Sequence, residues 1–309
     1  MPYHGMWLAQ QMFQRVRASC RIVLVGDPDQ LPSVGAGQVF ASLIKSGEIP
    51  VTVLDRIFRQ SKDGLIAYNA KFINEGSTRL YYGSDFEFVE SGNQQDTAAI
   101  IMKLYTDEIK ASGIENVQIL SPFRSRGEVS ADLLNLAIRE RVNPFRTEEE
   151  DVHLGIKVFR VGDRVMQTKN TEKVSNGDLG FVRSIETRSD DKRVLLDFGT
   201  ERLLTYRMEE LANLDLAYAT TIHKAMGSEF ETVIVPVIKP HAIMLYRNLL
   251  YTAITRARKK VILVGQKSTL FLAIHKSDIS KRNTKLADRI QMYSQVLAAD
   301  HTTRLPEAV

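Results

Sequence analysis

The chain has 309 residues, of which 44% are hydrophobic and 25% charged, and it carries a formal net charge of +4. This length suits about two domains, and the composition excludes a disordered, collagen-like or disulfide-rich small protein. The mildly basic balance fits a polyanionic partner but does not identify one.

Cysteine and histidine usage argues against disulfides and finger-type zinc sites. Cys20 is the only cysteine, and the six histidines are scattered along the chain. We therefore expect a protein of the reducing cytoplasm. The longest apolar runs fall short of the ~20 residues of a membrane-spanning helix, and residues 1–25 do not have the form of a signal peptide, so no membrane partner is expected.

Apolar runs and helical patterns alternate along most of the chain. Residues 5–16 show helical spacing, and residues 21–26 form a continuous apolar run that predicts a buried strand. The remaining predicted strands are residues 117–120, 232–237 and 260–265, and the remaining predicted helices are residues 63–74, 95–112, 126–141 and 246–258. Continuous hydrophobicity is typical of parallel strands covered on both faces, so the pattern predicts an α/β fold.

Residues from about 148 to 210 follow a different pattern and predict a small β-barrel inserted in the α/β domain. Short alternating segments occur at residues 157–161, 163–167, 179–186, 193–198 and 202–206. Asn176-Gly177 is good turn chemistry, because both residues tolerate positive φ. The chain from about Lys276 onward is polar without a strong period, which predicts a frayed tail.

The loop at residues 26–35 directly follows the first predicted strand and has polar tips. Ligands of open α/β sheets bind outside the carboxyl ends of the strands, so Asp27 and Gln30 would face a ligand. The alternative is a turn that only closes the strand.

Three further segments make the interpretation of this loop more specific. They are residues 53–60, which end in Arg59-Gln60, the string TIHKAMGSEF at residues 221–230 and the string YTAITRAR at residues 251–258. With GDPDQLPSVGAGQVF at residues 26–40, they resemble motifs three to six of superfamily 1 helicases. The closest likeness is to the RecD-like branch, related to the exodeoxyribonuclease V alpha chain, and it covers about residues 7–270.

The resemblance implies two RecA-like (P-loop NTPase-like) domains with ATP bound in the cleft between them. Residues 1–57 would then end the first RecA-like domain. Residues 58–147 and 213–275 would form the second, with an SH3-like barrel inserted at residues 148–212 and a C-terminal tail at residues 276–309.

The resemblance also implies a nucleotide site. The residue matching Gln30 senses the γ-phosphate, and the arginines matching Arg59 and Arg256 reach across the cleft to it. Asp27, Gly227 and Glu229 would lie on the nucleotide side. A guanidinium offers forked donors to phosphate oxygens and stabilises the charge that develops in phosphoryl transfer. A solvated surface charge is the alternative for either arginine.

By the same resemblance, Thr221, His223 and Lys224 lie toward single-stranded DNA. Hydroxyl, imidazole and ammonium groups suit phosphate contacts, although His223 could instead be a core histidine. Arg124 follows a predicted strand and precedes a helix start, so it is either a contact to the DNA backbone or part of a plain exposed loop. The basic residues of the insert either line the DNA path or are ordinary solubilising charge: Arg160, Arg164, Lys169 and Arg183.

Two motifs that a helicase needs do not occur in this sequence. It contains no Gly-Lys dipeptide for a phosphate loop and no acidic residue before Asp27. Asp107-Glu108 falls at helical spacing with its apolar neighbours and is interpreted as a helix end. The expected cofactors are ATP and Mg²⁺, with the metal ligands outside this chain in a missing N-terminal helicase half.

The leading hypothesis is the C-terminal motor portion of a RecD-like, ATP-dependent DNA helicase that moves 5′ to 3′ on single-stranded DNA in recombination and repair. The 309 residues alone are predicted not to hydrolyse ATP at a helicase rate. One alternative is a non-catalytic DNA- or partner-binding module. Another is a helicase linked to a primase or a relaxase.

Overall fold

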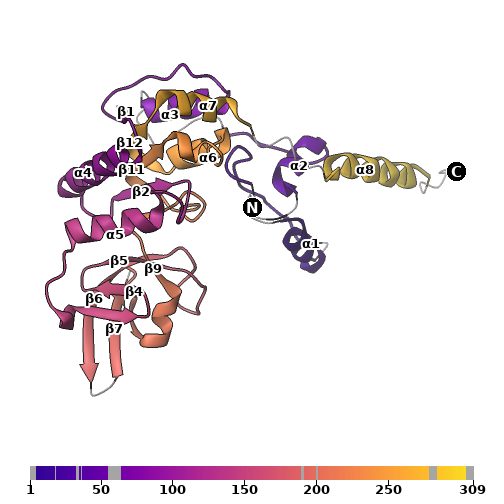
Figure 1. The fold of residues 1–309 in the computed structure, drawn as a ribbon. Coiled ribbons are helices and arrows are strands. Elements are labelled where there is room, and N and C mark those ends of the chain that lie inside the picture. The colour runs from indigo at the N-terminus through magenta and orange to yellow at the C-terminus, as the bar shows by residue number, and fades with distance from the viewer. Residues whose placement is uncertain are drawn as a thin grey trace. The chain divides into compact units, whose positions relative to one another are not determined.

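The computed structural model describes residues 5–17, 19–32, 35, 37–54, 64–188, 191–199, 201–277 and 284–303. The chain divides into two compact units (Figure 1). Unit 1 comprises Met1–Phe58 and Lys276–Val309, and unit 2 comprises Arg59–His275. Each unit is described by itself.

A five-stranded parallel sheet forms the centre of unit 2, with the strand order β1-β12-β11-β2-β10. Its strands are β1 (Phe86–Glu90), β2 (Val117–Ser121), β10 (Ala219–Thr221), β11 (Phe230–Val237) and β12 (Ala257–Gly265). The predicted parallel sheet is thus confirmed, as are the strands expected near residues 117, 232 and 260. The edge strands β1 and β10 are not among the predicted strands, because the first mixes apolar and acidic residues over five positions and the second has only three residues.

Helices cover both faces of this sheet (Figure 1). The helices α4 (Gln94–Ser112) and α5 (Ala131–Val142) pack on one face, where Ile101, Tyr105 and Leu134 meet the sheet in one core cluster. The helices on the other face are α3 (Leu65–Asn74), α6 (Arg247–Ile254) and α7 (Lys267–His275). We name the sheet and these helices, residues 64–147 and 217–275, the sheet domain.

The ends of these helices have local causes. The Asn93 side chain accepts a 2.9 Å hydrogen bond from the Asp96 backbone N–H and caps α4. The helix predicted from residue 126 begins only at Ala131, because Gly127 has φ +83° and cannot continue a helix. The expected helix end at Asp107-Glu108 lies within α4, where Glu108 Oε1 accepts a 2.7 Å hydrogen bond from Lys260 Nζ.

The β-rich insert forms as predicted, and we name residues 151–216 the barrel. An antiparallel sheet of order β8-β7-β6-β5-β9 is joined by the β3-β4 hairpin. Its strands are β3 (Asp151–Leu154), β4 (Lys157–Arg160), β5 (Arg164–Gln167), β6 (Leu179–Arg188), β7 (Asp191–Asp197), β8 (Leu203–Arg207) and β9 (Leu214–Leu216). Short 3₁₀ helices are η1 (Glu148–Glu150), η2 (Met208–Asn213) and, in the sheet domain, η3 (Lys239–His241). Val165, Val182 and Val194 lie in a core of the barrel's own.

Two neighbouring buried residues join the barrel to the sheet domain. Asp163 Oδ1 accepts hydrogen bonds of 2.9 Å from Asn143 Nδ2 and 2.8 Å from the Tyr218 hydroxyl. Burial raises the pKa of the Asp163 carboxyl, and these hydrogen bonds oppose that rise. The adjacent Arg164 guanidinium donates to the backbone carbonyl oxygens of Ile114, Glu115 and Val117. Because buried polar groups bond across the junction, the barrel is fixed to the sheet domain.

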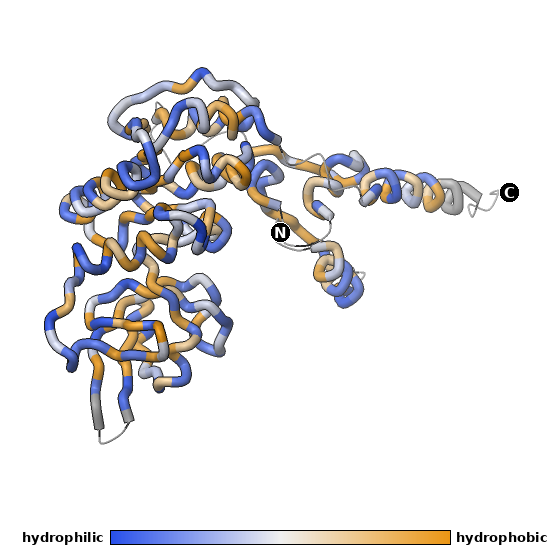
Figure 2. Tube along the Cα trace, viewed as in Figure 1, coloured by the Kyte–Doolittle hydropathy of each residue, from blue (hydrophilic) through white to orange (hydrophobic). Residues whose placement is uncertain are grey.

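The strand predicted at residues 21–26 of unit 1 is wrong. Its described helices are α1 (Met6–Arg15), α2 (Val39–Ser46) and α8 (Leu286–Thr303). Residues 21–26 are not a strand, and Val23 and Val25 are 75% and 74% exposed. Figure 2 colours the trace by hydropathy, and apolar stretches, in orange, occur in both units. A strand needs hydrogen-bonded neighbours, and no strand occurs among the described residues of unit 1.

The C-terminal segment corrects a second prediction. Where the sequence predicts a frayed tail, residues 286–303 form α8. This helix lies against the segment around α2, since Gln291 Nε2 donates a 2.8 Å hydrogen bond to the Ser46 carbonyl oxygen, and Ser294 Oγ lies 2.5 Å from Glu48 Oε2. Tertiary contacts of this kind stabilise a helix whose own periodicity is weak.

Candidate functional site

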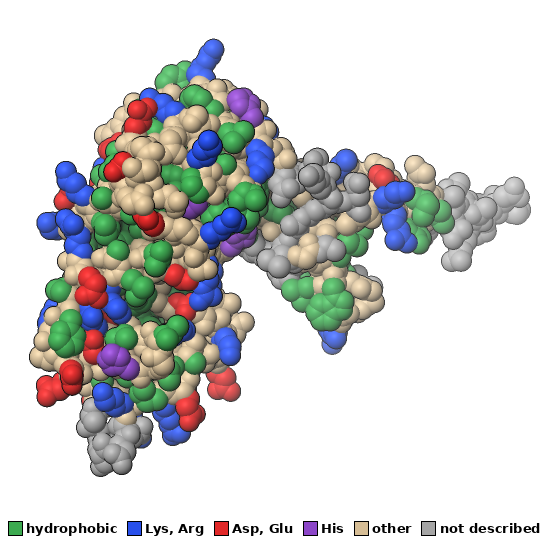
Figure 3. Space-filling model, in the orientation of Figure 1, with side chains coloured by type: hydrophobic (Ala, Val, Ile, Leu, Met, Phe, Trp, Pro, Cys, Tyr) green, Lys and Arg blue, Asp and Glu red, His purple; other side chains and the backbone are tan. Residues whose placement is uncertain are grey.

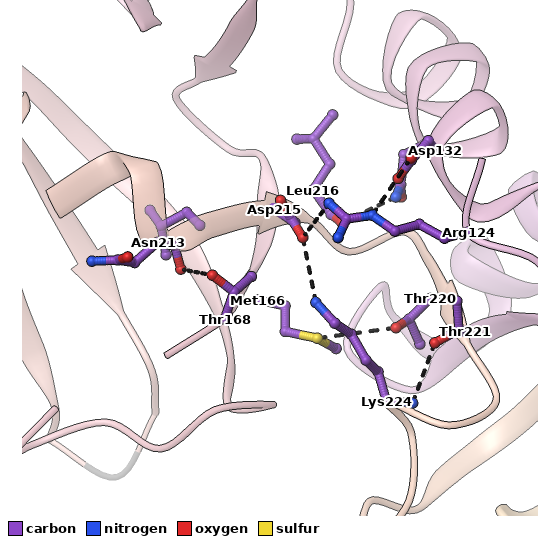
Figure 4. Close-up of polar contacts among 12 residues, drawn as sticks. Arg124, Asp132, Met166, Thr168, Asn213, Asp215, Leu216, Thr220, Thr221 and Lys224 are labelled. Carbon is purple, nitrogen blue, oxygen red and sulfur yellow. Dashed lines mark hydrogen bonds and ion pairs between the residues drawn. The ribbon is translucent and has the colours of Figure 1, made fainter. Parts of the chain in front are cut away.

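The loops after β2 and β10 place predicted DNA-contact residues at the carboxyl ends of these two parallel strands. Ser121 ends β2 and Thr221 ends β10, and the two residues are register partners in the parallel pair. Arg124 follows the first strand and Lys224 follows the second. Both side chains turn to one carboxylate, Asp215 of β9 (Figure 4).

The distances around Asp215 define a compact charge cluster. Arg124 Nη2 lies 3.2 Å and Lys224 Nζ 3.4 Å from Asp215 Oδ2, and Lys157 Nζ of β4 lies 3.0 Å from Oδ1. We name these three cations and Asp215 the Asp215 cluster. The Arg124 side chain is 59% exposed and that of Asp215 is 21% exposed. The cluster therefore joins three cations from separate segments at a partly open position.

The electrostatics of the cluster favour an ionised carboxylate. Partial burial raises the pKa of Asp215, but the hydrogen bond and charge of Lys157, with the charges of Lys224 and Arg124, outweigh it. The pKa of Asp215 consequently lies below its usual value, and the three cations keep an anionic partner at neutral pH.

Lys157 is a member that sequence reasoning missed. It lies at the start of β4, and its ammonium also donates to the backbone carbonyl oxygens of Ala212 and Leu214 at 3.2 and 2.7 Å. Basic residues are spread over this part of the sequence, and no local pattern separates this lysine from the others. Only the pairing of the barrel strands brings it to Asp215.

The four basic residues of the insert that the sequence singled out lie elsewhere. Arg160 is buried and pairs with Asp151 and Glu140, and Arg164 is buried at the junction. Neither is solubilising charge or a surface contact, so both alternatives are wrong for them. Arg183 is exposed and pairs with Asp197, and Lys169 is exposed.

The segment after β10 is a tight turn that presents His223 to solvent. The Lys224 backbone N–H donates to the Thr221 carbonyl oxygen at 3.0 Å, and the Thr221 hydroxyl accepts from the same N–H at 3.3 Å. The His223 side chain is exposed. The interpretation of His223 as a core histidine is therefore wrong, while its contact with a ligand stays a prediction.

The same segment continues to the other end of the strands, where the parallel strand β11 begins. Because β10 and β11 both run parallel to β2, Thr221 lies at the carboxyl edge of the sheet, where strands end, and Phe230 at the amino edge, where strands begin. The two residues are roughly 15–20 Å apart at about 3.3 Å per residue. Gly227 has φ +92°, a conformation that favours glycine over residues with a side chain. Residues 221–230 thus link the two edges.

At this amino edge, two predicted nucleotide residues of unit 2, Glu229 and Arg256, lie on adjacent segments. Arg256 is 6% exposed, and its Nη1 donates a 3.2 Å hydrogen bond to the Ser228 carbonyl oxygen. Glu229 Oε2 accepts a 2.9 Å hydrogen bond from Arg258 Nε. Ser228 and Glu229 also line a cavity of about 610 Å³ at the junction with the barrel. Arg256 is not a solvated surface charge in this arrangement.

Two further predicted nucleotide residues, Asp27 and Gln30, belong to unit 1. Asp27 accepts hydrogen bonds from the Asp29 backbone N–H at 2.9 Å and from Gln30 Nε2 at 3.1 Å, so unit 1 brings Asp27 and Gln30 together. Arg59 lies outside the described residues. The convergence of Gln30, Arg59 and Arg256 on one phosphate stays a prediction.

The visible surface of the sheet domain and the barrel carries charges of both signs. On the face shown in Figure 3, acidic and basic side chains are interspersed over the sheet domain and the barrel. Within the described ranges, no group of three or more metal-ligating His, Cys, Asp or Glu side chains occurs. Nor is any described helix long and apolar enough to cross a membrane.

Sequence families match the chain in three segments. Residues 3–94 match the AAA domain, residues 134–198 match the SH3 domain of ATP-dependent RecD-like DNA helicases, and residues 216–264 match the UvrD-like helicase C-terminal domain. The second match assigns the barrel as SH3-like. The third covers the segments that hold Arg256 and Lys224.

Curated relatives agree with this assignment. The chain is 33% identical over 288 residues to the ATP-dependent RecD2 DNA helicase of Deinococcus radiodurans, covering 93% of this chain and 38% of that protein. It is 29% identical to the RecBCD enzyme subunit RecD of Mycolicibacterium smegmatis, covering 91% of this chain and 51% of the relative. The Pif1 helicase structure from Candida albicans matches with a TM-score of 0.49 and 18% identity, covering 88% of this chain and 67% of that one.

The chain spans only about a third to a half of the length of these two curated relatives. The matched families follow one another in the same order as the sequence motifs. These matches relate the chain in sequence to the RecD-like branch of the superfamily 1 helicases.

Proposed function

We propose that the chain is part of the motor of an ATP-dependent DNA helicase that moves 5′ to 3′ along single-stranded DNA in recombination and repair. Residues 1–57 would end the first RecA-like domain, and unit 2 would be the second with its SH3-like insert. The similarity to an ATP-dependent RecD2 DNA helicase and to the RecD subunit of a RecBCD enzyme supports this assignment.

One observation carries the proposal: residues 221–230 connect the two functional edges of the sheet domain. Lys224 contacts the Asp215 cluster at one end, and Ser228 holds Arg256 at the other. Successive backbone hydrogen bonds, Ala225 to Thr221 and Ser228 to Ala225, make the segment a continuous turn. A shift of Arg256 on nucleotide binding would therefore be transmitted to the cation that contacts DNA.

The DNA side of the proposal rests on phosphate chemistry. Arg124 and Lys224 offer charge-assisted donors at a partly open position, and such contacts read the backbone without reading the bases. Binding should then be indifferent to sequence and weaken with salt, because phosphate contacts release condensed counterions.

The nucleotide side rests on donor chemistry. When bound, ATP supplies the phosphoryl group whose transfer to water drives the motor. Arg256, Arg59 and Gln30 would hold its terminal phosphate with guanidinium and amide donors. The described residues contain no metal-ligand cluster, so we assign no step to Mg²⁺ here. With no Gly-Lys dipeptide in the sequence, the chain alone should not hydrolyse ATP at a helicase rate.

The test has two measurements. Fluorescence anisotropy of a labelled oligo-dT strand should show binding by the 309-residue chain that weakens linearly in log–log plots against salt. A DNA-stimulated ATPase assay of the same chain should show only background turnover. Robust turnover abolished by Arg256→Ala would contradict the inactivity, and absence of DNA binding would contradict the motor role. A complete protein whose DNA affinity ignores ATP analogues would instead support a non-catalytic binding module.

A further inference from the structure

The Asp215 cluster pairs cations with an internal carboxylate at the position assigned to DNA phosphate. Arg124 Nη2 and Lys224 Nζ both lie within 3.4 Å of the same oxygen, Asp215 Oδ2 (Figure 4). The carboxylate thus takes the place that one phosphate oxygen would take between these donors.

The third cation has a different role. Lys157 contacts the other oxygen, Oδ1, at 3.0 Å, and its ammonium also donates to two backbone carbonyl oxygens. With all of its N–H donors engaged, Lys157 is suited to hold Asp215 in place rather than to bind an external ligand. Arg124 and Lys224, which come from two separate loops, are the members able to exchange partners.

We propose, on the basis of the proposed function, that Asp215 is an internal substitute for a DNA phosphate. Arg124 and Lys224 leave Asp215 when DNA binds and return to it when DNA departs. A backbone phosphate of single-stranded DNA is the occupant. Asp215 competes with the phosphate for the two cations.

The energetics favour competition over simple positioning. Ion pairs between partly exposed side chains contribute little stability, so the loss of Asp215 costs the cluster little of its geometry. Removing its negative charge, in contrast, leaves Lys224 able to pair with phosphate and leaves Arg124 with the more distant carboxylate of Asp132, 3.6 Å away. It also makes the local charge more positive. A motor must also release each phosphate as it steps, and an internal acceptor lets the contact break without leaving cations unpaired.

The sign of one substitution tests this proposal. Asp215→Asn keeps the shape and an acceptor oxygen, and it should tighten oligo-dT binding by the 309-residue chain three- to tenfold at low salt. A carboxylate that served only to position the cations would weaken binding when changed to Asn. The probe is a fluorescein-labelled oligo-dT strand titrated by anisotropy.

Asp132→Asn is the matched control. Asp132 lies 3.6 Å from Arg124 Nε, whereas Lys224 and Lys157 pair with Asp215, so this change removes the same charge from the same neighbourhood. It should alter affinity less than twofold. Equal tightening by both variants would show a plain net-charge effect and would overturn the proposal.

A double-mutant cycle locates the effect. In an Arg124→Gln, Lys224→Met background, Asp215→Asn should no longer tighten binding, because the competing cations are gone. Persistent tightening there would overturn the proposal. Circular dichroism checks folding, and if both Asp215→Asn and Asp215→Ser unfold the chain, Asp215 is a stability residue and the proposal fails.

The failures are distinguishable. If the wild-type chain does not bind oligo-dT at all, the proposed DNA role fails and this inference fails with it. If the wild-type chain binds and Asp215→Asn binds equally or more weakly, only the inference fails.

Discussion

The guanidinium of Arg164 in the barrel donates a 2.6 Å hydrogen bond to the backbone carbonyl oxygen of Val117, a residue of the sheet domain 47 positions earlier in the chain. The same side chain serves the carbonyl oxygens of Ile114 and Glu115. The barrel therefore carries Lys157 and Asp215 at a fixed position relative to the loops that hold Arg124 and Lys224.

Arg164→Met should destabilise unit 2 by about 3 kcal/mol, because three carbonyl oxygens, one of them fully buried, lose their charged donor. Urea denaturation followed by circular dichroism measures the loss. Arg183→Gln is the control, since Arg183 is an exposed arginine in the adjacent strand and its change should cost about 0.5 kcal/mol or less. Equal stability of the two variants would contradict the role of Arg164.

The stability of unit 2 should fall between about pH 6.5 and pH 4 because of His241. Burial lowers the pKa of His241 to about 4, and the nearby backbone of Pro236 opposes that decrease in part. The unfolded state has a histidine pKa of about 6.5, so in this window it takes up a proton that the folded state does not. The contribution is complete above about pH 6.5 and is lost as the pH falls toward 4, by roughly 3 kcal/mol at most.

His241→Phe tests this pH dependence, since it keeps an aromatic ring beside Phe123, whose centroid lies 5.3 Å away. The difference in unfolding free energy between the variant and the wild type should shift in favour of the variant as the pH falls. His275→Gln, a change of an exposed residue at the end of α7, should not reproduce that shift. Parallel stability curves for wild type and His241→Phe would refute the prediction.

Lys224→Met should weaken binding to oligo-dT and reduce its salt dependence. One phosphate contact contributes about 0.7 to the slope of log affinity against log salt on a single strand, so the slope should fall by about that amount. Lys71→Met, which changes an exposed lysine paired with Glu75 on α3, should leave the slope unchanged. The comparison requires anisotropy titrations over a range of KCl concentrations.

Arg256→Lys should lower the DNA-stimulated kcat of the complete helicase, by on the order of 10³-fold if Arg256 acts on the developing phosphate charge. A lysine keeps the charge but not the forked donors. Lys224→Met should instead raise the DNA concentration needed for half-maximal stimulation with a smaller effect on kcat. A steady-state ATPase assay separates the two, and identical profiles would argue against two edges with different ligands.

The sequence by itself determined the parts of the fold that continuous apolar runs encode. The strands β2 and β11 and the last five residues of β12 are almost wholly buried, as is typical of apolar runs in parallel strands that are covered on both faces. The motif strings also determined the family, because they carry their meaning in order and spacing. In contrast, residues 21–26 have the same apolar character and are exposed, since burial of a strand depends on neighbours that its own sequence cannot specify.

Only the tertiary structure decided which charges matter. Arg160, Arg164, Lys157 and Lys169 are all basic residues of one small insert, and nothing local in the sequence separates them. Strand pairing buries the first two, exposes the last, and sets Lys157 3.0 Å from Asp215. The physical reason is that a charge takes its role from the partners within a few ångströms of it, and those partners lie far away along the chain.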